Sequence, residues 1–128
     1  MPDKVQQEVY GRIKSFQYAF AGWWYVLRTQ HNAWIHAVIS IAVFVLGFWL
    51  QIPLRDWAVI VLTMMAVWMA EFMNTAIEAV VDMTMPQYHP LAKAAKDVAA
   101  AAVLVGAVGA VLIGLLLLGP PLIDKLFG

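Results

Sequence analysis

The sequence predicts an all-α integral membrane protein, with three transmembrane helices and an N-terminal amphipathic surface helix. Hydrophobic residues make up 63% of the 128 positions, against roughly 45–50% in a typical soluble domain. Charged residues make up 12%, against roughly 25% in such a domain. Three apolar stretches are each long enough to cross a hydrocarbon core, which needs about 20 residues. We expect residues 1–128 to form a single domain.

The surface helix is expected over residues 4–28. Its apolar residues recur at steps of three and four, which places them on one face of a helix: Val5, Val9, Ile13, Phe16, Phe20, Trp23, Trp24 and Leu27. Basic residues occupy other positions of the same segment. This pattern favours a helix that lies in the membrane interface, with its aromatic rings at headgroup depth. An ordinary packing helix is the alternative.

The three transmembrane helices are expected at residues 33–52, 57–81 and 91–118. The first contains no formally charged residue and is closed by Pro53 and the charged pair after it. The third has a cytoplasmic extension that Pro90 starts, and we expect Gly119, Pro120 and Pro121 to end it, because proline supplies no backbone donor.

Basic residues near the ends of the spans predict the orientation. With three crossings, the N-terminus and the second loop share one side of the membrane. That side carries six basic residues, against Arg55 and Lys125 on the other: Lys4, Arg12, Lys14, Arg28, Lys93 and Lys96. We therefore expect a multi-pass protein of the bacterial inner (plasma) membrane with a cytoplasmic N-terminus.

The second span is anomalous, because it carries polar and acidic residues after 14 uncharged ones. Asn74, Glu78 and Asp82 lie within roughly 60° of Glu71 around the helix axis, so one face carries all four. A charged group at mid-bilayer costs roughly 2.5 to 3.5 kcal/mol, which makes a functional role the preferred interpretation. A solvated helix end is the alternative, and it suits Asp82 best.

Acidic oxygens beside an amide side chain suit Mg²⁺, which takes a few carboxylates and keeps substrate phosphates as further ligands. Lys93, Lys96 and Asp97 follow after a short loop, and lysine offers a point charge to phosphate oxygens. The two lysines could equally be membrane anchors on the positive side.

Several function classes are excluded by composition and motif. Eight basic and eight acidic residues give a net charge of zero, which argues against a nucleic-acid partner. The absence of cysteine excludes a disulfide framework and a thiolate site. Neither a GxxxxGK[ST] nor a GxGxxG phosphate loop occurs, and the three histidines are too scattered for a metal pair.

The pattern ExxNTAIExxxD, which begins at Glu71 and ends at Asp82, resembles the bacterial diacylglycerol kinase and undecaprenol kinase family of small integral-membrane kinases. The resemblance continues through residues 88–93 and 95–100 and upstream through residues 16–22, so it covers about residues 12–120. Some residues look more like the undecaprenol kinase branch: Asn32, Ile35, His36, the run Tyr88, His89 and Pro90, and the pair Gly119 and Pro120.

The resemblance implies a membrane lipid kinase domain that spans the chain and assembles as a homotrimeric helical bundle. Its active sites would be shared between neighbouring subunits at the cytoplasmic interface. The reaction would transfer the γ-phosphate of ATP, with Mg²⁺, to the primary hydroxyl of a lipid alcohol, either undecaprenol or diacylglycerol.

The resemblance also implies residue roles. Glu71 would be the general base on the lipid hydroxyl, Asn74 would help to hold the phosphate and metal geometry, and Glu78 would be a metal ligand at the nucleotide. Other residues would contact the nucleotide: Tyr18, Gln30, Gln87, Tyr88, His89, Lys96 and Asp97. Relatives commonly carry a metal-binding Glu where this chain has Gln30, so Gln30 is the expected second metal ligand, with less charge to offer. Relatives often carry Glu at the position of Gln87 as well.

The sequence leaves two hypotheses from other functional classes open. A small oligomeric proton-coupled transporter could use Glu71 as its intramembrane carboxylate. A catalytically silent membrane scaffold could have lost metal binding at Gln30. Consumption of ATP that depends on an added lipid alcohol would exclude both.

Overall fold

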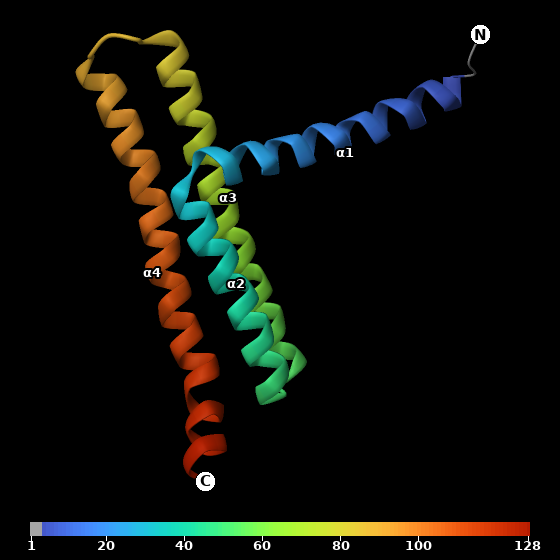
Figure 1. The fold of residues 1–128 in the computed structure, drawn as a ribbon, viewed down its shortest axis with the longest axis vertical. Helices are drawn as coiled ribbons and strands as arrows, with labels where there is room; N and C mark the ends of the chain where they lie inside the picture. Colours follow the sequence, from blue (N-terminus) through green and yellow to red (C-terminus); the bar gives the residue numbers. More distant parts are fainter. Residues whose placement is uncertain (1–3) are drawn as a thin grey trace.

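The computed structural model describes residues 4–128, which form four helices joined by short connections. They are α1 (Lys4–Thr29), α2 (His31–Leu50), α3 (Leu54–Thr84) and α4 (Pro90–Phe127), and residues 4–128 contain no strand. Helices α2, α3 and α4 run side by side, whereas α1 projects from one end of this bundle (Figure 1). The all-α prediction is confirmed.

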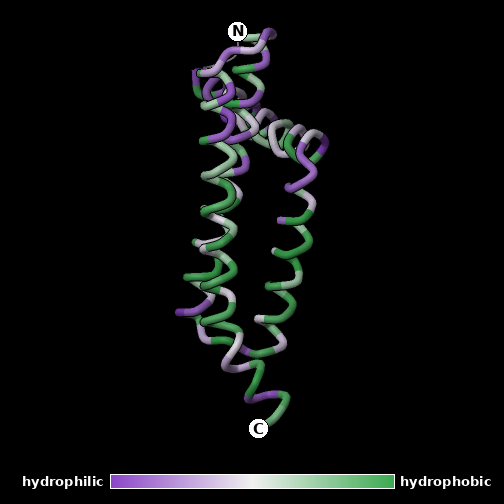
Figure 2. The backbone as a smooth tube through the Cα atoms, turned by 90° about the vertical axis from the view of Figure 1, so that its left-hand side faces the viewer, coloured by the Kyte–Doolittle hydropathy of each residue, from purple (hydrophilic) through white to green (hydrophobic). Residues whose placement is uncertain are grey.

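Three of the helices are long and apolar enough to cross a membrane. They are α2 with 20 residues, α3 with 31 and α4 with 38. Large apolar side chains cover their outer surfaces, and Phe48, for example, is 70% exposed. In Figure 2 hydrophobic residues dominate the length of the three helices, and hydrophilic residues gather at the end from which α1 projects. Apolar residues around the whole circumference are what a helix in lipid requires.

Helix α1 is joined to the bundle at its C-terminal end. Val26 is the buried residue of Lys4–Thr29. The Trp23 ring lies against α3, with its centroid 4.7 Å from that of Trp68 and 4.8 Å from that of Phe72. Upstream of this contact the apolar side chains of α1 are exposed, as at Phe16 and Phe20. This leaves the apolar stripe of α1 open to a membrane surface.

The end of the bundle away from α1 holds the main apolar core. Leu50, Ile52, Ile60 and Leu118 are buried together there. The turn between α2 and α3 is tight, and the backbone N–H of Ile52 donates to the carbonyl of Gly47 across 3.2 Å.

Gly47 permits a close approach between α2 and α3. A Cβ at this position would lie 2.7 Å from the Trp57 ring, closer than two carbon atoms can approach without a shift. The indole of Trp57 stacks on the Phe44 ring at a centroid distance of 5.4 Å and contacts Phe48 at 4.8 Å. Trp57 is therefore held against α2 by two aromatic rings that flank the Gly47 turn of that helix.

The prediction that Gly119, Pro120 and Pro121 end the last helix is wrong. Helix α4 continues through both prolines to Phe127. Contacts beyond the prolines explain the continuation, because Leu122 packs on the apolar core. The Lys125 ammonium donates to the carbonyl of Trp49 across 2.8 Å and lies 4.9 Å from the centroid of the Trp49 ring. These tertiary contacts outweigh the loss of two backbone donors.

We expect Gly47→Ala to destabilise the protein, because the added methyl group meets the Trp57 ring. Overpacking of this kind costs about 1–3 kcal/mol. The measurement is the thermal midpoint of the purified protein in detergent. The control is Gly109→Ala in α4, where an added Cβ meets nothing within 4 Å. Equal midpoints for the Gly47 variant and the unchanged protein would contradict the expectation.

Candidate active site

Glu71 lies inside the bundle rather than at a solvated helix end. Its side chain is 1% exposed, and Asn74 and Thr75 beside it on α3 are buried as well. The Thr75 hydroxyl donates to the backbone carbonyl of Glu71 across 2.8 Å, so it leaves the carboxylate untouched. Helix α3 thus carries an acidic side chain into the membrane-spanning part of the fold, where only a few polar groups surround it.

Two amides hold the carboxylate of Glu78. The Nε2 of Gln30 donates to its Oε2 across 2.8 Å, and the Nδ2 of Asn74 donates to its Oε1 across 3.2 Å. Gln30 is the single residue between α1 and α2, with an extended backbone at φ −108° and ψ 112°. Its own N–H donates to the carbonyl of Val26 across 2.9 Å, which fixes the corner. The corner between the two helices therefore delivers the Gln30 side chain to α3.

Two oxygen atoms of the site have no hydrogen-bond partner within residues 4–128, although both are buried. They are Oε2 of Glu71 and Oδ1 of Asn74. Buried polar atoms in folded proteins are nearly always paired, so both atoms are available to a ligand.

The oxygen atoms of this site suit Mg²⁺ only when phosphate oxygens supply further ligands. The described residues contain no group of three or more His, Cys, Asp or Glu side chains that could hold a metal ion. One carboxylate from Glu78 and the amide oxygens of Gln30 and Asn74 are hard oxygen ligands. Mg²⁺ is usually bound through one or two carboxylates, with water and substrate phosphates completing its shell.

A second polar cluster lies where α3 ends and α4 begins. The Lys96 ammonium donates to Oδ1 of Asp82 across 2.7 Å, and Lys93 pairs with Asp97 one turn along α4. Asp82 thus ties α4 to α3 near the charged end of the bundle. The predicted nucleotide contacts Lys96 and Asp97 are brought to this cluster, and each has a charged partner in it.

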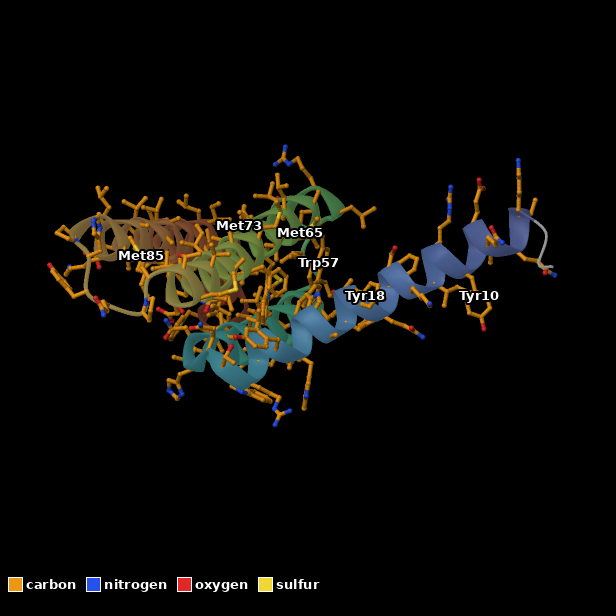
Figure 3. All side chains as sticks on the ribbon, turned by 90° about the horizontal axis from the view of Figure 1, so that it is seen from above. Tyr10, Tyr18, Trp57, Met65, Met73 and Met85 are labelled. Carbon is orange, nitrogen blue, oxygen red and sulfur yellow. The ribbon has the colours of Figure 1, made fainter. Side chains whose placement is uncertain are left out.

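Four other predicted nucleotide contacts remain apart from Glu71 and Glu78 within one chain. Gln87, Tyr88 and His89 are exposed in the connection between α3 and α4. The Nδ1 of His89 accepts from the backbone N–H of Leu91 across 3.2 Å, which caps the start of α4. Figure 3 shows Tyr18 on the part of α1 that projects from the bundle, and its side chain is 71% exposed.

His36 was missed as a site residue, because a lone histidine in an apolar span is more often a packing residue. Its Nε2 lies 3.8 Å from Oε2 of Glu71. The available signal was that His36 is the one titratable residue in the first predicted span, residues 33–52. A polar group there needs a partner on a neighbouring helix.

Comparison with known proteins finds similarity over most of the chain. The family model described as prokaryotic diacylglycerol kinase matches residues 17–118. An undecaprenol kinase of Bacillus subtilis (strain 168) is 44% identical over 110 residues, covering 86% of this chain and 89% of the relative. A diacylglycerol kinase of Synechocystis is 47% identical over 113 residues, covering 88% of this chain and 65% of the relative. The diacylglycerol kinase of Escherichia coli (strain K12) is 34% identical over 113 residues, covering 83% of this chain and 87% of the relative.

These matches support the kinase interpretation over the transporter and the silent scaffold. The family model covers α2, α3, and α4 as far as residue 118, and so includes the cluster around Glu71 and Glu78. The chain belongs to the prokaryotic diacylglycerol kinase family and is a membrane lipid kinase.

Proposed function

We propose that this kinase transfers the γ-phosphate of ATP, bound with Mg²⁺, to the primary hydroxyl of a membrane lipid alcohol. Undecaprenol and diacylglycerol are the proposed acceptors, after the names of the relatives in Bacillus subtilis and Synechocystis. The observation that carries the proposal is the buried carboxylate of Glu71 on a membrane-spanning helix, on the same helix as the amide-held carboxylate of Glu78.

Glu71 is the proposed general base. As the bond between the lipid oxygen and the γ-phosphorus forms, the carboxylate takes the hydroxyl proton, and the bond from phosphorus to the β,γ-bridging oxygen breaks. An acceptor hydroxyl attached to a lipid tail reaches this depth without leaving the membrane. The enzyme's remaining task is to position the phosphate and offset its charge.

Glu78 is the proposed metal ligand, with Gln30 and Asn74. Glu78 follows Glu71 by seven residues, which is about 10 Å along the helix and places it nearer the charged end. When bound, Mg²⁺ supplies positive charge against the phosphate oxygens. The proposed base therefore lies deeper in the membrane, where the lipid approaches, and the proposed metal site lies nearer the charged end, where the nucleotide approaches.

Lys96, Asp97, Tyr18, Gln87, Tyr88 and His89 are the proposed nucleotide contacts. Several of these are exposed and do not face Glu71 in one chain, which supports an active site completed by a neighbouring subunit of a homotrimer. The projecting helix α1 leaves the bundle in the same half that carries the connection between α3 and α4, below that connection in the view of Figure 1. Six of the eight basic residues lie on α1 and in the first two turns of α4, which supports a cytoplasmic location for this end in the bacterial inner membrane.

The experiment that tests the function offers undecaprenol and diacylglycerol side by side in the same micelles, with radiolabelled ATP and purified protein. We expect labelled phosphate on at least one lipid and no label without Mg²⁺. The identity of the product assigns the acceptor. Absence of label on both lipids would overturn the proposal.

Glu71→Gln should abolish most of the activity, because an amide cannot take the hydroxyl proton. A general base contributes roughly 10²- to 10⁴-fold, so we expect kcat to fall within that range. ATP binding and the oligomeric state should remain. Glu8→Gln on the exposed part of α1 makes the same chemical change outside the site and serves as the control. Unchanged turnover in the Glu71 variant would rule out the general-base role.

Gln30→Glu should lower the Mg²⁺ concentration needed for half-maximal activity. The new carboxylate replaces the amide that donates to Glu78, and two adjacent carboxylates attract a divalent cation more strongly than one. Gln30→Ala, which removes the side-chain oxygen, should raise the requirement. A Mg²⁺ titration of the three proteins makes the comparison, and a higher requirement in Gln30→Glu would refute the metal-ligand role.

A further inference from the structure

We propose that His36 is a positioning residue for Glu71. In this proposal Nε2 of His36 donates a hydrogen bond to Oε2 of Glu71, which leaves Oε1 to take the proton of the lipid hydroxyl. The inference rests on the proposed role of Glu71 and adds a residue from a second helix to the site.

The first support is the geometry of the pair. His36 on α2 and Glu71 on α3 face each other, with 3.8 Å between Nε2 and Oε2 and side-chain exposures of 14% and 1%. Oε2 is buried and has no hydrogen-bond partner within residues 4–128, so a donor is missing at this atom. A shift of under 1 Å would bring the pair to hydrogen-bond distance. Hydrogen bonds in catalytic sites are often long without substrate and tighten when it binds.

The second support is the packing that orients the His36 ring. It meets the Trp68 ring edge-on, with 6.4 Å between centroids and 67° between planes. Trp68 is held in turn by Trp23 of α1 and by Phe72, at 4.7 and 5.8 Å between ring centroids. The imidazole is therefore held by an aromatic cluster that also anchors the surface helix.

The third support is the chemical isolation of the pair. His36 lines a cavity of about 480 Å³ between α2, α3 and α4, and it is the one titratable residue among the described lining residues. Helix α4 adds only apolar and small residues to that lining. On α3 the acidic groups on this side are Glu71 and, two turns further, Glu78, whose oxygens are held by amides. Within residues 4–128, Glu71 is thus the one acidic side chain with an oxygen within 4 Å of the His36 ring nitrogens.

A donor at Oε2 would have a direct effect on catalysis. A carboxylate on a flexible side chain rotates, and each rotation moves the accepting oxygen away from the hydroxyl. Fixing one oxygen fixes the other, and a displacement of about 1 Å in a reacting group can cost 10²-fold in rate. The expected effect of losing His36 is therefore on kcat, with little change in the KM for ATP or lipid.

The experiment compares His36→Leu with the unchanged protein in the lipid kinase assay. We expect kcat to fall by roughly 10- to 100-fold with KM for both substrates unchanged. Thr63→Val is the control, because Thr63 lines the same cavity while its hydroxyl donates to the Val59 carbonyl and not to Glu71. This control should keep the unchanged kcat. A normal kcat in His36→Leu would overturn the proposal.

A second pair of variants keeps the side chain polar, in case His36→Leu does not fold. His36→Gln places an amide donor near the position of Nε2, whereas the shorter His36→Asn cannot reach Glu71. We expect His36→Gln to keep most of the activity and His36→Asn to lose it. Full activity of His36→Asn would show that no donor at this position is needed and would overturn the proposal.

A double-mutant cycle separates positioning from a purely structural role. Glu71→Asp draws the carboxylate back from His36, so adding His36→Leu in that background should cost much less than it does alone. An equal cost in both backgrounds would overturn the proposal. Failure of the proposed function looks different, because the unchanged protein would then label no lipid at all.

Discussion

A carboxylate that must be buried in a membrane-spanning helix is the constraint on which the site depends. Lipid offers no water to solvate the Glu71 side chain, so protein groups must do so, and the cost of an ionised group at such depth reaches roughly 2.5 to 3.5 kcal/mol. In this fold, polar side chains from other segments lie against the same face of α3. His36 approaches from α2, and Gln30 reaches Glu78 from the corner between α1 and α2.

The two ends of the bundle differ in the contacts that join the helices. Away from α1, Leu50, Ile60 and Leu118 form an apolar core, and Gly47 lets Trp57 pack against α2. Toward the other end polar contacts between segments accompany the aromatic cluster, and they include the bond from Gln30 to Glu78 and the ion pair between Lys96 and Asp82. The apolar core holds the helices together at one end, and the buried polar groups of the site lie toward the other.

Much of this arrangement could be predicted from the sequence. Composition and apolar runs predicted the membrane class and three spans, and helical periodicity placed Glu71, Asn74 and Glu78 on one face.

Contacts between distant segments could not be predicted in this way. Gln30 and Glu78 are 48 positions apart, and only the geometry of the corner brings them together. The continuation of α4 beyond Pro121 depends on the contact between Lys125 and Trp49, which local propensity does not contain. The roles of all the site residues, from Glu71 and Glu78 to the exposed Tyr18, stay predictions.

The one-residue joint at Gln30 has a mechanical consequence. Helix α1 has 26 residues and acts as a lever about 39 Å long. Gln30 alone connects α1 to α2, and its side-chain amide also donates to the carboxylate of Glu78. A change in the tilt of α1 therefore turns the amide that faces the carboxylate. With α1 lying in the membrane interface, as its apolar stripe predicts, the tension and curvature of the lipid surface would be coupled to the geometry of the candidate active site.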